Sequence, residues 1–145
     1  MRKIILALAV IAVATGNANA RSQSIWDGFY TEDQAARGAT AYQQNCARCH
    51  GANLAGTFEI PPLVGRFVPY WSGSSLDVLV DYISRAMPLG RPGSLSPATN
   101  ADITAFILKR NGFPAGPGRL GRSSSMCGGL IGTISTVTPV TPSSR

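Results

Sequence analysis

The chain has few side chains that could bind a transition metal: one histidine, three cysteines and three methionines in 145 residues. His50 is the only imidazole, which excludes sites built from two or more histidines. Acidic residues are also scarce, with seven Asp and Glu against thirteen Lys and Arg. No apolar run approaches the roughly twenty residues that a membrane-spanning helix needs. Any cofactor chemistry must therefore depend on a small number of positions.

The excess of basic residues does not indicate nucleic-acid binding. Between Arg21 and Gly118, eight Arg and Lys stand against seven Asp and Glu. The remaining excess lies in the two terminal segments, and the middle has no Lys/Arg cluster with interleaved aromatic residues. We therefore expect no nucleic acid among the partners and only weak electrostatic steering of a protein partner.

The first twenty residues are typical of a secretory signal peptide. Arg2 and Lys3 precede an apolar run from Ile4 to Ala14, and Ala18-Asn19-Ala20 forms a small-residue cleavage site. The run is too short to span a bilayer, so an uncleaved anchor is the weaker alternative. We expect cleavage after Ala20, export to the bacterial periplasm and no membrane span in the mature chain. Residues 21–118 are enough for one domain.

Three segments have the pattern of amphipathic helices, over residues 31–46, 74–87 and 96–111. The predicted N-caps are Thr31, Ser74 and Ser96, and the apolar stripes comprise Ala35, Gly38, Tyr42 and Cys46, then Leu76, Leu79, Val80 and Ile83, then Ile103, Phe106 and Ile107. Glycine and proline interrupt any period over residues 51–73, which we predict to be mostly loop. Residues 119–145 are rich in Ser, Gly and Thr and are predicted to be a disordered, low-complexity tail.

The motif Cys46-Ala47-Arg48-Cys49-His50 follows the first predicted helix. This C-x-x-C-H spacing is the attachment signature of c-type haem. It lets both sulfurs reach the two vinyl groups on one side of a porphyrin and holds the adjacent histidine under the iron. A zinc site would need a second ligand pair downstream, where the chain offers only Cys127, and a thioredoxin-like dithiol would need a βαβ context. Covalent haem is the preferred interpretation, with zinc and dithiol sites as alternatives.

The axial ligands of the iron can be predicted from the same shortage of side chains. His50 is the fifth ligand, and its other ring nitrogen needs an acceptor, which the loop at Pro61 and Pro62 can offer as a carbonyl. The initiator methionine leaves with the signal, and Met126 lies in the tail. Met87, at the exit of the second predicted helix, is therefore the predicted sixth ligand, with an ordinary core methionine as the alternative. His/Met ligation raises the reduction potential of a haem.

On these residues the chain resembles the class I monohaem cytochromes c, and among them the small cytochromes associated with quinoprotein (PQQ-dependent) dehydrogenases. The resemblance lies in YTEDQAARGATAYQQNCARCHGANLAG, PPLVGRFVPYWSGSSLDVLVDYI and MPLGRPGSLSPATNADITAFILKRNGFPAG, which cover nearly everything from Tyr30 to Gly116. It implies an all-α class I cytochrome c fold, with about three helices and loops around one covalently attached haem c.

The resemblance also implies roles for individual residues. Gly38 on the first helix would cross the last helix near Phe106, and Met87 would ligate the iron. The side chains expected near the haem propionates are Trp71, Tyr70, Arg66 and Arg91. For each of these four, the alternative is a solvated side chain or ordinary core packing.

These features predict an electron carrier rather than an enzyme. The expected function is a periplasmic one-electron shuttle from a dehydrogenase, with PQQ-dependent alcohol or sugar dehydrogenases as candidates, to another cytochrome or a terminal oxidase. One alternative is a haem subunit fixed in a dehydrogenase complex. Another is a haem enzyme or gas sensor with a labile sixth ligand, which would need a distal polar group. We expect a monomer, with a dimer through the unpaired Cys127 as the alternative.

Overall fold

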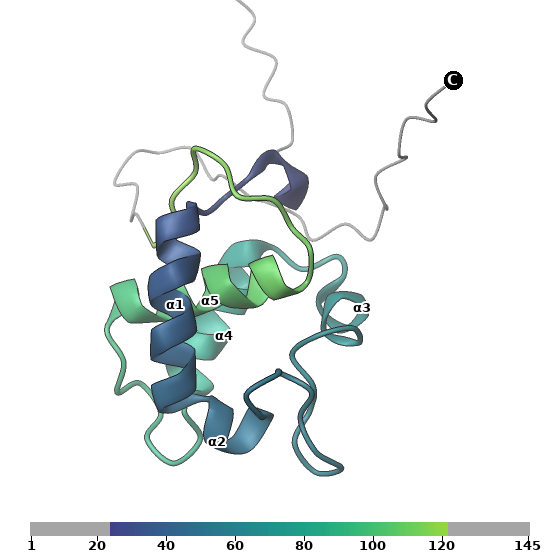
Figure 1. Cartoon of the computed structure of the whole chain (residues 1–145), viewed down its shortest axis with the longest axis vertical. Helices are drawn as coiled ribbons and strands as arrows, with labels where there is room; N and C mark the ends of the chain where they lie inside the picture. Colours follow the sequence, from purple (N-terminus) through teal and green to yellow (C-terminus); the bar gives the residue numbers. More distant parts are fainter. Residues whose placement is uncertain (1–23, 122–145) are drawn as a thin grey trace, which may run out of the picture.

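The computed structural model describes residues 24–121, and in this range the backbone is helical with no extended β-strand (Figure 1). The elements are η1 (Ile25–Asp27), α1 (Glu32–Asn45), α2 (Ala47–His50), α3 (Phe67–Trp71), α4 (Leu76–Ala86) and α5 (Pro97–Arg110). The predicted all-α class is confirmed. Within the same range, no helix has the length and apolar character needed to cross a membrane. The predicted signal peptide, Met126 and Cys127 lie outside the described residues.

Helix α1 crosses α5 with the two backbones in contact (Figure 1). The helix begins at the predicted N-cap Thr31, in a capping box in which the Thr31 hydroxyl accepts from the Gln34 N–H and the Gln34 side chain accepts from the Thr31 N–H. At the crossing, a Cβ added to Gly38 would overlap the Asp102 carbonyl oxygen and would lie 2.9 Å from the Phe106 Cβ. The glycine is therefore required by the close approach, as the resemblance implied.

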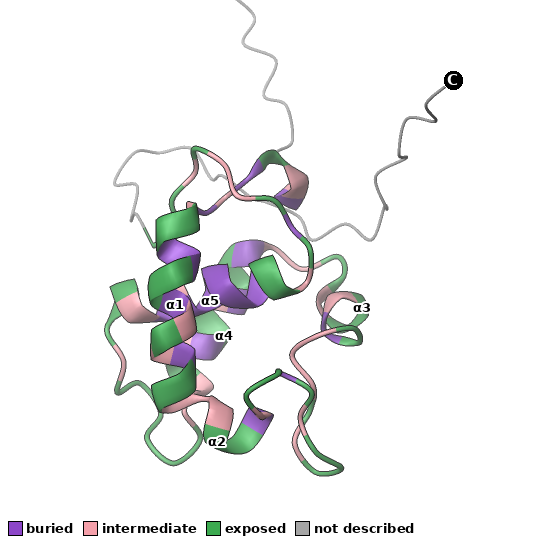
Figure 2. Cartoon of the chain, in the orientation of Figure 1, coloured by how far each residue is buried: buried purple, intermediate pink, exposed green. Residues whose placement is uncertain are grey.

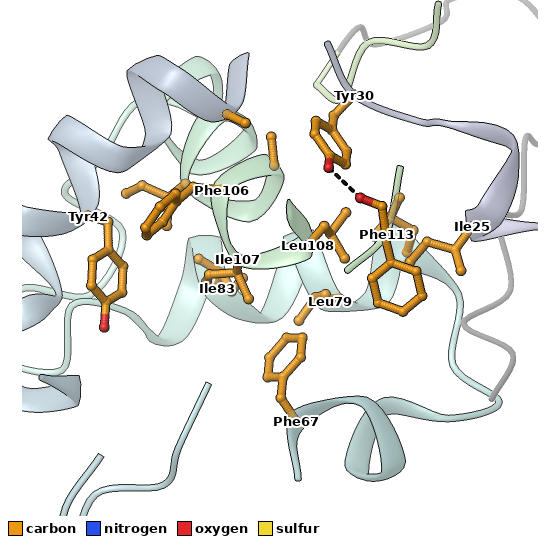
Figure 3. Packing of buried hydrophobic residues seen from close by; sticks show 14 of the residues in the cluster. Ile25, Tyr30, Tyr42, Phe67, Leu79, Ile83, Phe106, Ile107, Leu108 and Phe113 are labelled. Atoms are coloured by element: carbon orange, nitrogen blue, oxygen red, sulfur yellow. Dashed lines mark hydrogen bonds between the residues drawn. The ribbon is translucent and has the colours of Figure 1, made fainter. Parts of the chain in front are cut away.

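Helix α5 is buried on more of its circumference than its sequence pattern predicted. It contacts both α1 and α4, so residues on several faces of α5 are buried (Figure 2). The resulting core is continuous from Tyr42 and Phe106 at one end to Phe113 and Ile25 at the other (Figure 3). The buried residues of α5 are Asn100, Ala101, Ile103, Thr104, Ala105, Phe106, Ile107 and Leu108.

One detail of the predicted elements was wrong, and one short helix was not predicted. The N-cap of α4 is Ser75 rather than Ser74, because Ser75 has the extended conformation and its hydroxyl accepts from the Val78 N–H. Residues 51–73 are mostly loop, as predicted, but they also include the short helix α3, which was not predicted. Pro69 is the third residue of α3, where its missing N–H costs nothing because the first turn has no acceptor for it.

The packed domain extends slightly beyond its predicted end at residue 118. The Gln34 side-chain amide donates to the Leu120 carbonyl at 3.0 Å and accepts from the Leu120 N–H at 3.3 Å. The Gly118 N–H donates to the Gly28 carbonyl at 3.1 Å. Leu120, which the sequence assigned to the tail, is thus held against α1.

Candidate functional site

The C-x-x-C-H motif consists of Cys46, which lies between α1 and α2, and the one-turn helix α2 itself. Cys46 caps the end of α1, where its N–H donates to the Tyr42 carbonyl at 2.8 Å. Cys46 is half-buried, Cys49 is exposed, and both are free thiols. Burial, with a smaller effect of the neighbouring Cys49, raises the pKa of the Cys46 thiol to about 11. The first helix therefore delivers both sulfurs and His50 to one end of the domain.

His50 has one ring nitrogen engaged and the other free for a ligand. Its side chain is 9% exposed, and its Nδ1 lies 2.9 Å from the carbonyl oxygen of Pro61. A carbonyl can only accept, so Nδ1 carries the hydrogen and Nε2 retains its lone pair. This is the tautomer that binds a metal through Nε2. Of the two carbonyls that the sequence offered, Pro61 rather than Pro62 makes the contact.

The loop after His50 is folded so that the Pro61 carbonyl returns to the imidazole. The Gly56 N–H donates to the His50 carbonyl at 2.8 Å, and the Tyr42 hydroxyl donates to the Gly51 carbonyl at 2.7 Å. Gly56 has φ +66°, and a Cβ there would overlap the Ile60 carbonyl and lie 2.8 Å from the Pro61 carbonyl carbon. Only glycine fits this position without displacing the Pro61 peptide.

Met87 is the first residue after α4 and is half-buried against the hydrophobic core. Its N–H donates to the Ile83 carbonyl at 3.1 Å, which fixes its backbone to the last turn of the helix. The loop that follows returns to the end of α1, where Arg91 Nη2 lies 3.4 Å from Asn45 Oδ1. This contact connects the loop after Met87 to the residue that precedes Cys46.

The side chains expected near the haem propionates lie in two segments, α3 with its N-cap Arg66 and the loop after α4. Trp71 is half-buried, with its ring centroid 5.7 Å from that of Tyr70 and 5.4 Å from that of Tyr82. Tyr70 is 81% exposed. Arg66 is exposed immediately before α3, and Arg91 is exposed in the loop after α4. The aromatic pair is thus together, whereas the two arginines lie on different loops, and the propionate roles stay predictions.

The chemistry of these residues fits a covalently attached haem. Two free thiols stand in the attachment spacing beside a buried imidazole whose Nε2 is available. Apolar side chains near the site are packed on the core yet still partly exposed, as expected of residues that a flat apolar ring would cover. They are Leu63, Val64, Val68, Trp71 and Met87. Within residues 24–121, no group of three His, Cys, Asp or Glu side chains gathers as an ion site.

Three contributors to the site were not singled out as such from the sequence. Gly56 belongs to a Gly-rich loop whose individual glycines look alike, and the Tyr42 hydroxyl was expected only as part of a buried stripe. Asn111 was expected only as the end of the third predicted helix, whereas its side-chain Nδ2 donates to the Leu63 carbonyl at 2.8 Å. A buried tyrosine needs a hydrogen-bond partner for its hydroxyl, so a hydrogen bond from Tyr42 could have been predicted from the sequence.

Helices of this arrangement with a C-x-x-C-H turn at the end of the first one define a c-type cytochrome domain. The family described as cytochrome c oxidase, cbb3-type, subunit III matches residues 33–107. The chain belongs to this cytochrome c family, which confirms the predicted fold and covalently bound haem c.

Relatives of the chain include redox proteins of several kinds. Thiosulfate dehydrogenase of Stutzerimonas stutzeri (strain A1501) is 32% identical over 79 residues, covering 50% of this chain and 26% of that protein. Cytochrome c-551 of Bacillus subtilis (strain 168) is 40% identical over 50 residues, covering 34% and 45%. The crystal structure of the sulfane dehydrogenase SoxCD from Paracoccus pantotrophus is 27% identical, with a TM-score of 0.46, and covers 76% and 61%. The matched segments span about a quarter of the thiosulfate dehydrogenase and just under half of the cytochrome c-551.

Proposed function

We propose that the chain is an exported one-electron carrier in which His50 and Met87 are the axial ligands of the haem iron. When bound, the haem supplies one-electron chemistry through the ferric and ferrous states of its iron. The observation that carries the proposal is the hydrogen bond from His50 Nδ1–H to the Pro61 carbonyl, which leaves Nε2 for the iron. Met87 is the only methionine among residues 24–121 and is held at the end of α4.

The residues around the site have complementary tasks in such a carrier. The thioethers formed by Cys46 and Cys49 would retain the cofactor, and the Pro61 carbonyl would hold the imidazole in one orientation in both oxidation states. Fixed ligands keep the structural change between oxidation states small, which favours fast electron transfer. The half-buried apolar residues of the loop and α3 would exclude water from the ring and so help to set the potential.

We infer that the electron donor is a dehydrogenase and that the acceptor is another cytochrome or a terminal oxidase in the periplasm. We add thiosulfate dehydrogenases to the PQQ-dependent alcohol and sugar dehydrogenases as candidate donors, and the similarity of the chain to a thiosulfate dehydrogenase supports this addition. We propose that the chain acts as a carrier and does not itself convert a substrate. A partner would bind weakly at the haem edge over a small area, as transient redox complexes do.

A second candidate function is a haem subunit held permanently in a dehydrogenase complex. It is favoured by the partial coverage, because the match spans only 26% of the thiosulfate dehydrogenase relative. The two candidates differ in assembly and not in chemistry. Size-exclusion chromatography of the protein from native periplasm separates them, since a free carrier elutes as a small monomer and a fixed subunit elutes with its dehydrogenase.

Exposure of the ferrous protein to carbon monoxide tests the proposed ligation. A stable Met87 ligand leaves no open position, so the visible spectrum at neutral pH should remain unchanged over minutes. The matched comparison is the Met87→Ala variant, in which an open sixth position should bind carbon monoxide readily. Rapid binding by the unmodified protein would contradict a carrier with two fixed ligands and would support the haem enzyme or gas sensor.

A further inference from the structure

Asn111, the C-cap of α5, connects the last helix to the loop that carries Pro61. Its Nδ2 donates to the Ile107 carbonyl at 2.8 Å and to the Leu63 carbonyl at 2.8 Å. The bond to Ile107 fixes the side-chain amide on its own helix. The bond to Leu63, forty-eight residues away in the sequence, therefore attaches the loop to a rigid element.

Leu63 is the nearest point after Pro61 at which the loop can be attached through a backbone N–H. Pro61 and Pro62 have no N–H, so neither can anchor its own peptide by donating a hydrogen bond. Leu63 donates its N–H to the Leu54 carbonyl at 2.8 Å and accepts from Asn111 through its own carbonyl. Both backbone groups of Leu63 are thus engaged, and Pro61 lies only two residues before it.

On the other side of Pro61 the backbone is held by contact and by a turn. Gly56 packs against the Ile60 carbonyl and the peptide between Pro61 and Pro62, and the Thr57 N–H donates to the Ile60 carbonyl at 2.9 Å. The Pro61 carbonyl is therefore fixed from two directions, by the turn before it and by Leu63 after it. Of these supports, the Asn111 amide is the one side-chain hydrogen bond that comes from the helical core.

We propose that Asn111 is a positioning residue for the axial histidine, acting through Leu63 on the carbonyl that accepts from His50 Nδ1–H. This inference rests on the proposed ligation of iron by His50. A well-aligned hydrogen bond from Nδ1–H makes the imidazole a stronger electron donor to the metal. Stronger donation favours ferric iron, so loosening the Pro61 carbonyl should raise the reduction potential.

The test compares Asn111→Ala with Tyr30→Phe in the full chain carrying covalent haem. Tyr30→Phe is a matched control, because it removes a buried hydrogen bond of 2.6 Å to the Phe113 carbonyl, two residues after Asn111, without touching the loop. Two quantities are measured: the reduction potential by voltammetry, and the solvent exchange rate of the His50 Nδ1 proton by NMR of the ferrous protein. The control accounts for any general loss of stability at the end of α5.

Asn111→Ala should raise the reduction potential and should speed exchange of the Nδ1 proton by at least about tenfold, as expected for local opening. Tyr30→Phe should leave both quantities near those of the unmodified protein. If Asn111→Ala does not mature, Asn111→Ser removes the reach to Leu63 with a smaller change at the helix end and carries the same expectation.

Two results would overturn the inference. Unchanged potential and exchange in the Asn111 variant would show that the amide acts only as a helix cap. Equal changes in the Asn111 and Tyr30 variants would show a general effect of stability. Failure of the proposed function has a different signature, because the unmodified ferrous protein would then show no His50 resonances shifted by a ligated haem.

Discussion

Replacement of Gly38 by alanine should destabilise the domain, because it places a methyl group where α1 meets α5. The added Cβ would overlap the Asp102 carbonyl oxygen and approach the Phe106 Cβ to 2.9 Å. The obstacle is backbone of a buried helix, which cannot rotate away as a flexible side chain can. The two helices must therefore separate, and the packing between Tyr42 and Phe106, whose ring centroids are 5.3 Å apart, loosens with them.

The expected loss of stability is the cost of overpacking at the helix crossing minus the gain in helix propensity. Overpacking a well-packed contact costs about 1–3 kcal/mol, and a backbone obstacle belongs at the upper end of that range. Replacing a mid-helix glycine by alanine returns up to about 1 kcal/mol through helix propensity. The expected net loss is about 2 kcal/mol in the free energy of unfolding, which corresponds to about 10 °C in Tm for a domain of this size.

The assay is denaturant unfolding of the haem-loaded protein, followed by circular dichroism. Gly90→Ala is the matched control, since no atom lies within 4 Å of a Cβ built there, and its stability should change by less than about 0.5 kcal/mol. The variant Ala36→Gly, on the exposed face of α1, measures the difference in helix propensity between alanine and glycine without a change in packing. A Gly38→Ala protein as stable as the unmodified one, or more stable, would refute the helix crossing described above.

Two further predictions concern pH and ionic strength. Burial raises the pKa values of Tyr30 and Tyr42 from 10.0 to about 12; Glu32 adds a smaller upward effect on the pKa of Tyr30, and at Tyr42 smaller effects of Cys46 (upward) and Arg110 (downward) oppose each other. The stability that these neutral phenols contribute is therefore intact below pH 10 and is lost as pH rises toward 12. Unfolding curves at pH 9 and pH 11.5 should therefore differ less in Tyr42→Phe than in the unmodified protein, and an equal pH effect would exclude Tyr42 as a contributor. Because eight basic and seven acidic residues nearly balance between Arg21 and Gly118, stopped-flow reduction by a dehydrogenase should change less than about threefold from low to physiological ionic strength. A steep dependence would reveal a charged docking face.

Local patterns predicted the helices well because their signals lie within a few residues of each other. The predicted N-caps Thr31 and Ser96 both cap their helices in the structure. The choice between Ser74 and Ser75 could not be made in this way, because both are good caps and the approach of the preceding chain decides which one is extended. Helix α3 was missed because Pro69 and the flanking glycines interrupt its period.

The haem-attachment motif could be predicted from the sequence, whereas the hydrogen bonds that hold the surrounding loops in place could not. The C-x-x-C-H spacing has one dominant chemical use, and a carbonyl partner for His50 is a general requirement. The contact between Asn111 and Leu63 and that between Arg91 and Asn45 join residues more than forty positions apart. No local pattern encodes such pairs, since they arise only when the helices have packed.

The ferric visible spectrum of protein matured in a periplasm tests the central claim most directly. A methionine bound to ferric haem iron gives a charge-transfer band, which the unmodified protein and Met126→Ala should both show. The band should disappear in Met87→Ala, while the covalent haem remains attached through Cys46 and Cys49. A band that persists in Met87→Ala, or that disappears in Met126→Ala, would contradict the ligation by His50 and Met87 on which the proposed electron carrier rests.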